Sequence, residues 1–593
     1  MIFIILTLGI EKGIVIIMNT KKYRRVIINI IISFLFVIGL RYMSNTINNF
    51  NVVDSVLLVI LFYILEKKKI MPIKLDIIYS IICTIIFVIG KEIYLLHNIN
   101  NIFDYPLSYI CKILGVFIIF TVFFIIFRTM IQSTKLKYDD TWTISKKTLI
   151  LMIVSFIIMY SICYISYFPG LWSYDISVQH KMAIGEFYLA NNNPVIHTML
   201  WKFFVILGQK LGNDNFSVIF YTIFQIIVVI TTYVYFIIWT NKHKWNKKYI
   251  MLIYLYLLLN PLFQLFSIEI TKDVIFSCCL LFLSMGLSDL YNSHKKIDMF
   301  LVIIFGTLAC LLRNNMIYVI IVCNIFFIFI TKDKKILLSL TIIILVDLTT
   351  TNIIYDKLGI YPVSKGEMLS VPLIQMSKVL NEDNIYTKYE INKLKTFSKD
   401  IYKFNPRFAD YVKLYFDTDY YSSNKKEFWK LYLKGFKHNP YSYLCSFLDL
   451  NIPYWYANSI PIDDYSQRAY IEEGLYNKKL NNNIPNIFKF TKKIYHSFAS
   501  TNSKFMNLPI ISFYFSLSFP FYMLILSSYC FFLRKQNRIN LCIVIVYFLL
   551  FCTYLLGPVS NFRYIYPFYV AIPMYFGINI MESNNNKEND ENK

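Results

Sequence analysis

Charged side chains are scarce in this 593-residue chain, where Asp, Glu, Lys and Arg together make up 16%, against about 25% in soluble domains. Apolar residues make up 57%. They come in runs of about 17–25 residues with hardly a charge inside, the length that crosses ~30 Å of hydrocarbon. This composition excludes a soluble enzyme, a secreted disulfide scaffold and a disordered protein. Lipid is therefore the expected solvent for most of the chain.

Paired cysteines are also missing. Ten of the eleven cysteines lie in apolar runs, only Cys445 lies in a polar region, and no Cys-x-x-Cys occurs. Neither a framework of structural disulfides nor a zinc site is expected from this pattern.

Acidic residues are outnumbered by basic ones. Asp and Glu number 36 against 59 Lys and Arg, which gives a net charge of +23. Many of the basic residues lie in short clusters between apolar runs, the pattern of cytoplasmic loops that face anionic lipid. We therefore expect the lipid bilayer, and no nucleic acid, as the partner of this positive charge.

The apolar runs predict an all-α polytopic membrane protein with about fourteen transmembrane helices and both termini in the cytoplasm. The expected spans are residues 26–43, 52–66, 75–97, 107–131, 148–167, 216–240, 249–266, 274–291, 298–313, 315–331, 336–354, 509–533, 538–557 and 562–580. A further apolar stretch at 195–211 contains Lys202 and Lys210, and a crossing there would move the next lysine cluster outside. We expect a helix in the outer interface there instead.

Five parts follow from this organisation. They are a cytoplasmic N-terminus (1–25), a transmembrane region (26–354) with an outer loop (168–215), a mainly helical extracytoplasmic domain (355–508), C-terminal transmembrane helices (509–580) and a disordered cytoplasmic tail (581–593). Met1–Met18 lacks the basic start and cleavage site of a signal peptide, so Met18 is a candidate for the true start. Within the outer domain, Lys425–Gly435 and Pro440–Leu450 show helical periodicity.

The outer loop offers Asp175, His180 and His197. A carboxylate at the membrane surface suits a general base or a metal ligand. The plainer alternative is an ordinary solvated loop in which Pro169 and Gly170 turn the chain after a span.

A second cluster lies at Ser267–Asp273, also on the expected outer side. Glu269 and Asp273 would share one side of a helix at this spacing, with Lys272 beside them. Ionisable residues at the end of a span suggest function. A short solvated loop with a local ion pair is the alternative.

Two arginines, Arg313 and Arg563, also fall on the outer side. Each guanidinium is suited to grip a phosphate through two hydrogen bonds, although a snorkelling arginine at the interface is the alternative. Unrelated polar residues should scatter over both faces, so a shared outer site is the better account. The residues of this expected site are Asp175, Lys272, Asp273, Arg313 and Arg563.

Taken in order, these motifs resemble the GT-C superfamily of polytopic membrane glycosyltransferases, which includes protein mannosyltransferases and lipid A aminoarabinose transferases. Asp175 stands at the acidic position of the first outer loop, and Asn193–His197 resembles the Pro segment that follows it. Asn260-Pro261 followed by Asp273 resembles the Pro and the span-opening Asp. Arg563–Pro567 matches a late Arg-Tyr-x-x-Pro motif.

The details are most similar to an uncharacterised bacterial branch, a domain-of-unknown-function family. The similar segments are Pro169–Asp175, Lys272-Asp273, Arg313-Asn314, Pro440–Tyr443 and Tyr454–Tyr456. Each motif is short, so their order and shared side carry the resemblance.

The resemblance implies an enzyme of the bacterial plasma membrane. Its donor would be a polyprenyl-phosphate-linked sugar, because no nucleotide sugar exists outside the cell, and its acceptor an extracytoplasmic glycan, lipid or protein. Lys272, Arg313 and Arg563 would hold the donor phosphate. Asp175 would be the base, or would bind a divalent metal such as Mg²⁺ or Mn²⁺, although Tyr174 replaces the first residue of the acidic pair seen at some family sites. Asp273 would orient Lys272 or contact the acceptor.

Other expected substrate contacts are His180, His197, Glu269, Trp455 and Tyr456, with the two aromatic residues stacking on sugar faces. Two other functions remain open. A polysaccharide polymerase or ligase acting on lipid-diphosphate glycans would use Arg and His rather than Asp175. A lipid-glycan transporter would place charged residues inside its spans.

Overall fold

The computed structural model describes residues 21–44, 71–459, 486–500 and 508–581, apart from 105, 135, 140, 214 and 384. Within these residues helices dominate, and the only strands are β1 (Leu171–Trp172) and β2 (Glu269–Ile270). The expectation of an all-α protein is therefore confirmed. The expected span at 52–66, the candidate start at Met18 and the tail after Met581 lie outside the described residues.

The chain divides into two compact units, residues 1–135 and 136–593. The first contains α3 (Lys21–Ser44), α5 (Lys74–Leu96), α6 (Asn100–Asp104) and α7 (Pro106–Ser133). Helices α3 and α7 meet at Gly39 and Gly115, where an added Cβ would collide with the backbone of the other helix. Such close approach of glycines is a common way to join membrane helices.

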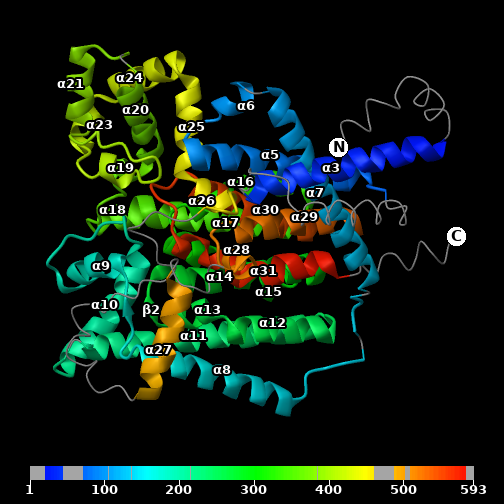
Figure 1. Cartoon of the computed structure of the whole chain (residues 1–593). Coiled ribbons are helices and arrows are strands. Elements are labelled where there is room, and N and C mark those ends of the chain that lie inside the picture. Colours follow the sequence, from blue (N-terminus) through cyan, green and yellow to red (C-terminus); the bar gives the residue numbers. More distant parts are fainter. Residues whose placement is uncertain are drawn as a thin grey trace. The chain divides into compact units, whose positions relative to one another are not determined.

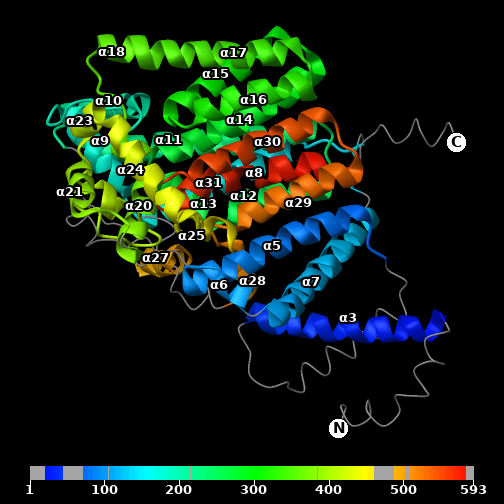
Figure 2. The same cartoon turned by 90° about the horizontal axis from the view of Figure 1, so that it is seen from above.

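The second unit begins with a long helical bundle. Its helices are α8 (Lys146–Ser166), α9 (Tyr174–Ile184), α10 (Val195–Lys210), α11 (Asn215–Lys242), α12 (Lys247–Leu259), α13 (Pro261–Ile268), α14 (Lys272–Ser293), α15 (Lys296–Leu312), α16 (Met316–Ile330), α17 (Lys334–Thr349), η1 (Thr350–Ile354) and α18 (Tyr355–Lys357). It is completed by α27 (Asn486–Ala499), α28 (Pro509–Tyr514), α29 (Phe519–Arg534), α30 (Arg538–Tyr554) and α31 (Phe562–Ile580). Helix α14 lies inside this bundle, packed against α11, α15, α30 and α31 (Figures 1 and 2).

Among the described residues, seven helices are long and apolar enough to cross a membrane, or eight if the bent pair α12–α13 counts as one span. They are α3, α5, α7, α8, α11, α14 and the continuous α17–α18. Several other expected spans form shorter apolar helices, namely α16, α29 and α30. The structure thus supports a helical membrane protein.

Two expected spans are interrupted. The span at 249–266 bends by 52° between α12 and α13. Pro261 has no N–H to continue the helix, and the Asn260 side chain accepts a hydrogen bond from the Leu262 amide, which starts a new helix. The span at 509–533 is likewise split into α28 and α29. The apolar stretch at 195–211 contains α10 (Val195–Lys210), which is not among the membrane-length helices.

The expected outer domain contains a compact helical cluster with its own apolar core. Its helices are α19 (Lys365–Met368), α20 (Ser370–Glu382), α21 (Lys388–Phe397), α22 (Asp410–Lys413), α23 (Thr418–Ser423), α24 (Lys425–His438), α25 (Pro440–Leu450) and α26 (Ile452–Trp455) (Figure 1). Leu373, Phe397 and Phe428 are buried at its centre. The two helices expected from periodicity are confirmed as α24 and α25. We call this cluster, residues 365–455, the helical insert.

Candidate functional site

A two-residue parallel ladder brings the outer loop against the start of α14. Leu171 pairs with Glu269 and Trp172 with Ile270. Directly after this ladder, the Ser173 hydroxyl donates to the Ile270 carbonyl at 2.6 Å. The next residues on each side open α9 and α14, so the first turns of these two helices lie side by side.

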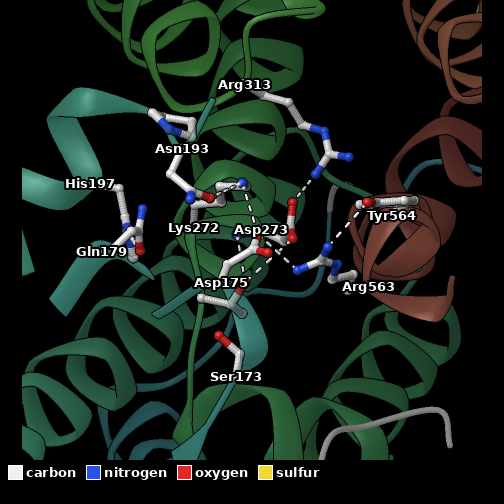
Figure 3. A network of polar contacts seen from close by, with 12 residues as sticks. Ser173, Asp175, Gln179, Asn193, His197, Lys272, Asp273, Arg313, Arg563 and Tyr564 are labelled. Carbon is white, nitrogen blue, oxygen red and sulfur yellow. Dashed lines mark hydrogen bonds and ion pairs between the residues drawn. The ribbon is translucent and has the colours of Figure 1, made fainter. Parts of the chain in front are cut away.

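Asp175, in the first turn of α9, pairs with two cations (Figure 3). Its Oδ2 lies 3.0 Å from Lys272 Nζ and 2.9 Å from Arg563 Nη1. Lys272 also donates to Asn193 Oδ1 at 3.3 Å. The three charged side chains come from the starts of α9, α14 and α31, and each is largely buried.

Asp273 makes a second ion pair, with Arg313 at the end of α15. The Asp273 side chain is 0% exposed. The Arg313 guanidinium carbon lies 4.6 Å from the ring centroid of Tyr554 and 4.7 Å from that of Tyr564, within range of a cation–π interaction. Arg563 donates to the Tyr564 hydroxyl at 3.1 Å. Tyr564 therefore contacts both arginines. Figure 3 marks its hydrogen bond with Arg563.

The charges of this ion-pair cluster do not cancel. Three cations and two carboxylates leave a net charge of +1. In addition, Nε of Arg313 and Nε of Arg563 are buried without a hydrogen-bond partner in the described part of the chain. Buried donors are normally satisfied, so these two, beside a positive excess, suit an anionic ligand.

The protonation of Asp175 follows from its neighbours. Burial alone would raise the pKa of this carboxyl, but the adjacent Arg563 and Lys272 outweigh burial and hold the pKa well below its usual range. Asp175 is thus ionised and a weak base as long as both cations touch it.

All five residues of the expected site converge, but their pairing differs from expectation. Of the two roles expected for Asp273, orienting Lys272 or contacting the acceptor, the first is not observed. Asp273 pairs with Arg313, and Lys272 pairs with Asp175. The expectation that Glu269 and Asp273 share one side of a helix is also wrong. Glu269 lies on β2, because α14 begins only after Thr271, whose side chain caps it. Glu269 is fully buried.

The two histidines support the framework of the site. His197 Nδ1 lies 2.9 Å from Gln179 Oε1, and its Nε2 lies 2.7 Å from the Tyr221 hydroxyl. Burial, assisted by the charge of Lys272, lowers the pKa of His197 to about 3, so the ring is neutral. It ties α9, α10 and α11 together instead of facing a substrate. His180 packs edge-on against Trp172.

The aromatic residues expected to stack on sugars are also internal. Trp455 is 9% and Tyr456 is 2% exposed, which leaves no ring face for a sugar. Their neighbour Tyr454 has a positioning role, because its hydroxyl accepts a hydrogen bond from the Asn561 amide at 3.1 Å. Asn561 in turn caps α31 through the Arg563 amide.

Three residues of the cluster were not expected from the sequence: Asn193 as the second partner of Lys272, and Tyr554 and Tyr564 beside the arginines. Tyr564 had a signal, since it lies within the Arg-Tyr-x-x-Pro motif. Tyr554 had none, because one tyrosine among 48 at the end of an apolar run is unremarkable in composition.

A divalent metal does not fit these residues. No three His, Cys, Asp or Glu side chains converge within the ranges that the structure describes. Asp175, the expected ligand, already faces two cations that would repel a metal ion.

Fold and site together define a helical membrane protein with a buried, net-positive ion-pair cluster where several helices begin or end. Residues 183–593, more than half of the chain, match the Family of unknown function (DUF6020), and the chain belongs to this family. Four of the five charged residues of the cluster lie inside the matched region, while Asp175 lies just before it. No curated protein and no solved structure matches the chain.

Proposed function

We propose that this protein is a GT-C-type glycosyltransferase of the bacterial plasma membrane. It transfers a sugar from a polyprenyl-phosphate donor to a glycan, lipid or protein on the outer face. The complete topology of this proposal has about fourteen spans with both termini in the cytoplasm. The supporting observation is the net charge of +1 in the cluster, because the phosphodiester of a polyprenyl phosphosugar carries one negative charge.

Donor binding involves an exchange of partners. The phosphate oxygens compete with the Asp175 carboxylate for Lys272 and Arg563, and the unpartnered Nε of Arg563 adds a further donor. When both cations turn to the phosphate, only burial acts on Asp175, and its pKa rises. Phosphate binding therefore converts a weak base into a competent one.

The transfer step is a displacement at the anomeric carbon of the donor sugar. The acceptor hydroxyl oxygen attacks the anomeric carbon and its proton passes to Asp175, while the bond from that carbon to the phosphate oxygen breaks. Polyprenyl phosphate leaves with the bonding electron pair. Its growing negative charge is stabilised by Lys272, Arg313 and Arg563, fixed cations in a site of low dielectric. Direct displacement inverts the anomeric centre.

The other two functions fit the cluster less well. A lipid diphosphate brings at least two negative charges to a site with an excess of one. A transporter would carry charges midway along its helices, whereas these lie at helix ends.

The test uses the purified full chain in nanodiscs with radiolabelled undecaprenyl-phosphate sugars and, in parallel, diphosphate-linked oligosaccharides. Release of undecaprenyl phosphate by the wild type, lost in Lys272→Met and Arg563→Gln, supports the proposal. Arg128→Gln is the matched control, because Arg128 forms a similarly buried ion pair with Asp76 in the first unit. Joining of diphosphate-linked glycans alone would assign a polymerase instead.

A further inference from the structure

A second candidate site lies at the opposite ends of the helices that carry the cluster. A cavity of about 170 Å³ is lined by Asn292 on α14 and Ile578 on α31. Lys272 begins α14, and Asn292 lies about 30 Å further along at 1.5 Å per residue. This is close to the thickness of the hydrocarbon layer. The cavity therefore faces the side of the lysine-rich loops, away from the ion-pair cluster.

Aromatic rings form one part of the cavity wall: Tyr138, Trp239 and Trp245. Their positions are fixed. The Trp239 indole N–H donates to Asp289 at 2.9 Å, and its ring centroid lies 5.7 Å from that of Trp245. Trp245 packs over Gly577, where any Cβ would meet its ring.

Hydrogen-bond acceptors form another part. The amide group of Gln536 donates to the Met581 carbonyl, and that of Asn540 donates to the Ile578 carbonyl at 2.8 Å. These bonds use the amide nitrogens, so the side-chain oxygens are available to accept hydrogen bonds from a ligand. His243 Nε2 binds Asp289 at 2.7 Å, which directs the other ring nitrogen elsewhere. These groups suit a ligand that donates hydrogen bonds.

The charge of the lining residues distinguishes between two kinds of ligand that donate hydrogen bonds, a cation and a neutral polyol. Rings and acceptors together could hold an ammonium group or a neutral polyol. However, no Asp, Glu, Lys or Arg is among the described residues that line the cavity. The carboxylate of Asp289, which contacts two lining residues, is already shared by Trp239, His243 and Lys242. Without a counter-ion, a neutral polyol is favoured.

We propose that this cavity binds one neutral sugar ring, whose C–H face lies on the aromatic wall and whose hydroxyls donate to Gln536 and Asn540. Its volume is below the ~300–1,000 Å³ of pockets for drug-sized ligands, so a single ring is the appropriate size. The sugar is a free hexose or the headgroup of a neutral glycolipid. This inference is independent of the proposed transfer reaction.

The experiment measures tryptophan fluorescence of the full chain in nanodiscs. Glucose, galactose and mannose are titrated in one arm, and nanodiscs containing monoglucosyl diacylglycerol form the other. Saturable quenching by a hexose or by the glycolipid is expected. Asn540→Leu and Asn292→Leu should weaken it at least tenfold, whereas Asn381→Leu, at an exposed position of the helical insert, should not.

Quenching in both arms assigns the site to a soluble or lipid-borne sugar, and quenching by the glycolipid alone assigns it to the headgroup. The absence of saturation in either arm overturns the inference, as does unchanged binding in both cavity variants. Stronger quenching by choline than by hexoses also overturns it. The unfolding temperature of each ligand-free variant separates loss of the site from loss of the fold.

Discussion

Lys272, the first residue of α14, pairs with Asp175 in the first turn of α9, at 3.0 Å across 97 residues of sequence. The same carboxylate oxygen also faces Arg563. A carboxylate thus occupies two cations. In the proposed reaction a donor phosphate would compete for them, with expected effects of opposite sign on binding and on chemistry.

Removal of the Asp175 charge tests this competition. In Asp175→Asn, Lys272 and Arg563 are released, so undecaprenyl phosphate should bind more tightly than to the wild type. Sugar transfer should fall about 10²–10⁴-fold because the base is gone. Equilibrium binding and single-turnover transfer are measured on the same preparation. Weaker binding together with slower transfer would mean that Asp175 only maintains the shape of the site.

The Asp273–Arg313 pair should dominate the stability of the cluster. Asp273→Ala leaves a buried guanidinium without its counter-ion, and about 3–5 kcal/mol of unfolding free energy should be lost. The double variant Asp273→Leu/Arg313→Met should recover most of this loss, because no buried charge remains. Reversible unfolding in mixed micelles measures both. A double variant as unstable as the single one would contradict this explanation.

Tyr564 should act on donor binding more than on turnover. Tyr564→Phe removes the hydroxyl that accepts from Arg563 but keeps the ring beside Arg313. A hydrogen bond to a charged group contributes about 1.5–3 kcal/mol, so the KM for the donor should rise about tenfold or more while kcat changes little. Tyr564→Leu also removes the ring and should lower kcat. Identical kinetics of both variants would exclude a role for the ring.

Stability should fall in mild acid because of His197. Its folded-state pKa is about 3 and its unfolded pKa is about 6.5, so the unfolded state binds the proton first. Each pH unit below 6.5 then costs about 1.4 kcal/mol, or about 2 kcal/mol by pH 5. Asp175 has a lowered pKa, so its contribution is present above about pH 4 and is lost only below that.

Unfolding free energies at pH 5, 6 and 7 check this expectation. His197→Gln should flatten the slope between pH 6.5 and 5. His438→Gln, at an exposed site on α24, should keep it. A slope that survives in His197→Gln would assign the effect to another group.

The sequence predicted which charged residues come together better than it predicted how they pair. Asp175, Lys272 and Arg563 stood out because charge is rare and costly at the ends of apolar runs. Their pairing depends on the β1–β2 ladder, whose two residues per strand leave no alternating pattern to detect. Side-chain burial could not be predicted either. The residue types of Trp455 and Tyr456 are compatible both with stacking on a sugar and with packing against a neighbouring helix.

The positions of helices were predicted from the sequence better than the positions of their ends. Hydropathy located the helices, and periodicity located α24 and α25 in the helical insert. The break at Asn260-Pro261 carried a readable signal, a capping residue followed by Pro at the first helical position, yet an apolar stretch of span length concealed it. At this position the local capping signal, and not the overall hydropathy, predicted the path of the backbone.

The attachment of the helical insert to α31 has a consequence for protein engineering. The Ala409 amide donates to the Pro558 carbonyl, the Ser560 hydroxyl donates to the Leu450 carbonyl, and Tyr454 receives the Asn561 amide. These three links hold the segment that aims Arg563. The helical insert therefore cannot be exchanged between relatives on its own. A chimera has to exchange residues 557–563 together with it.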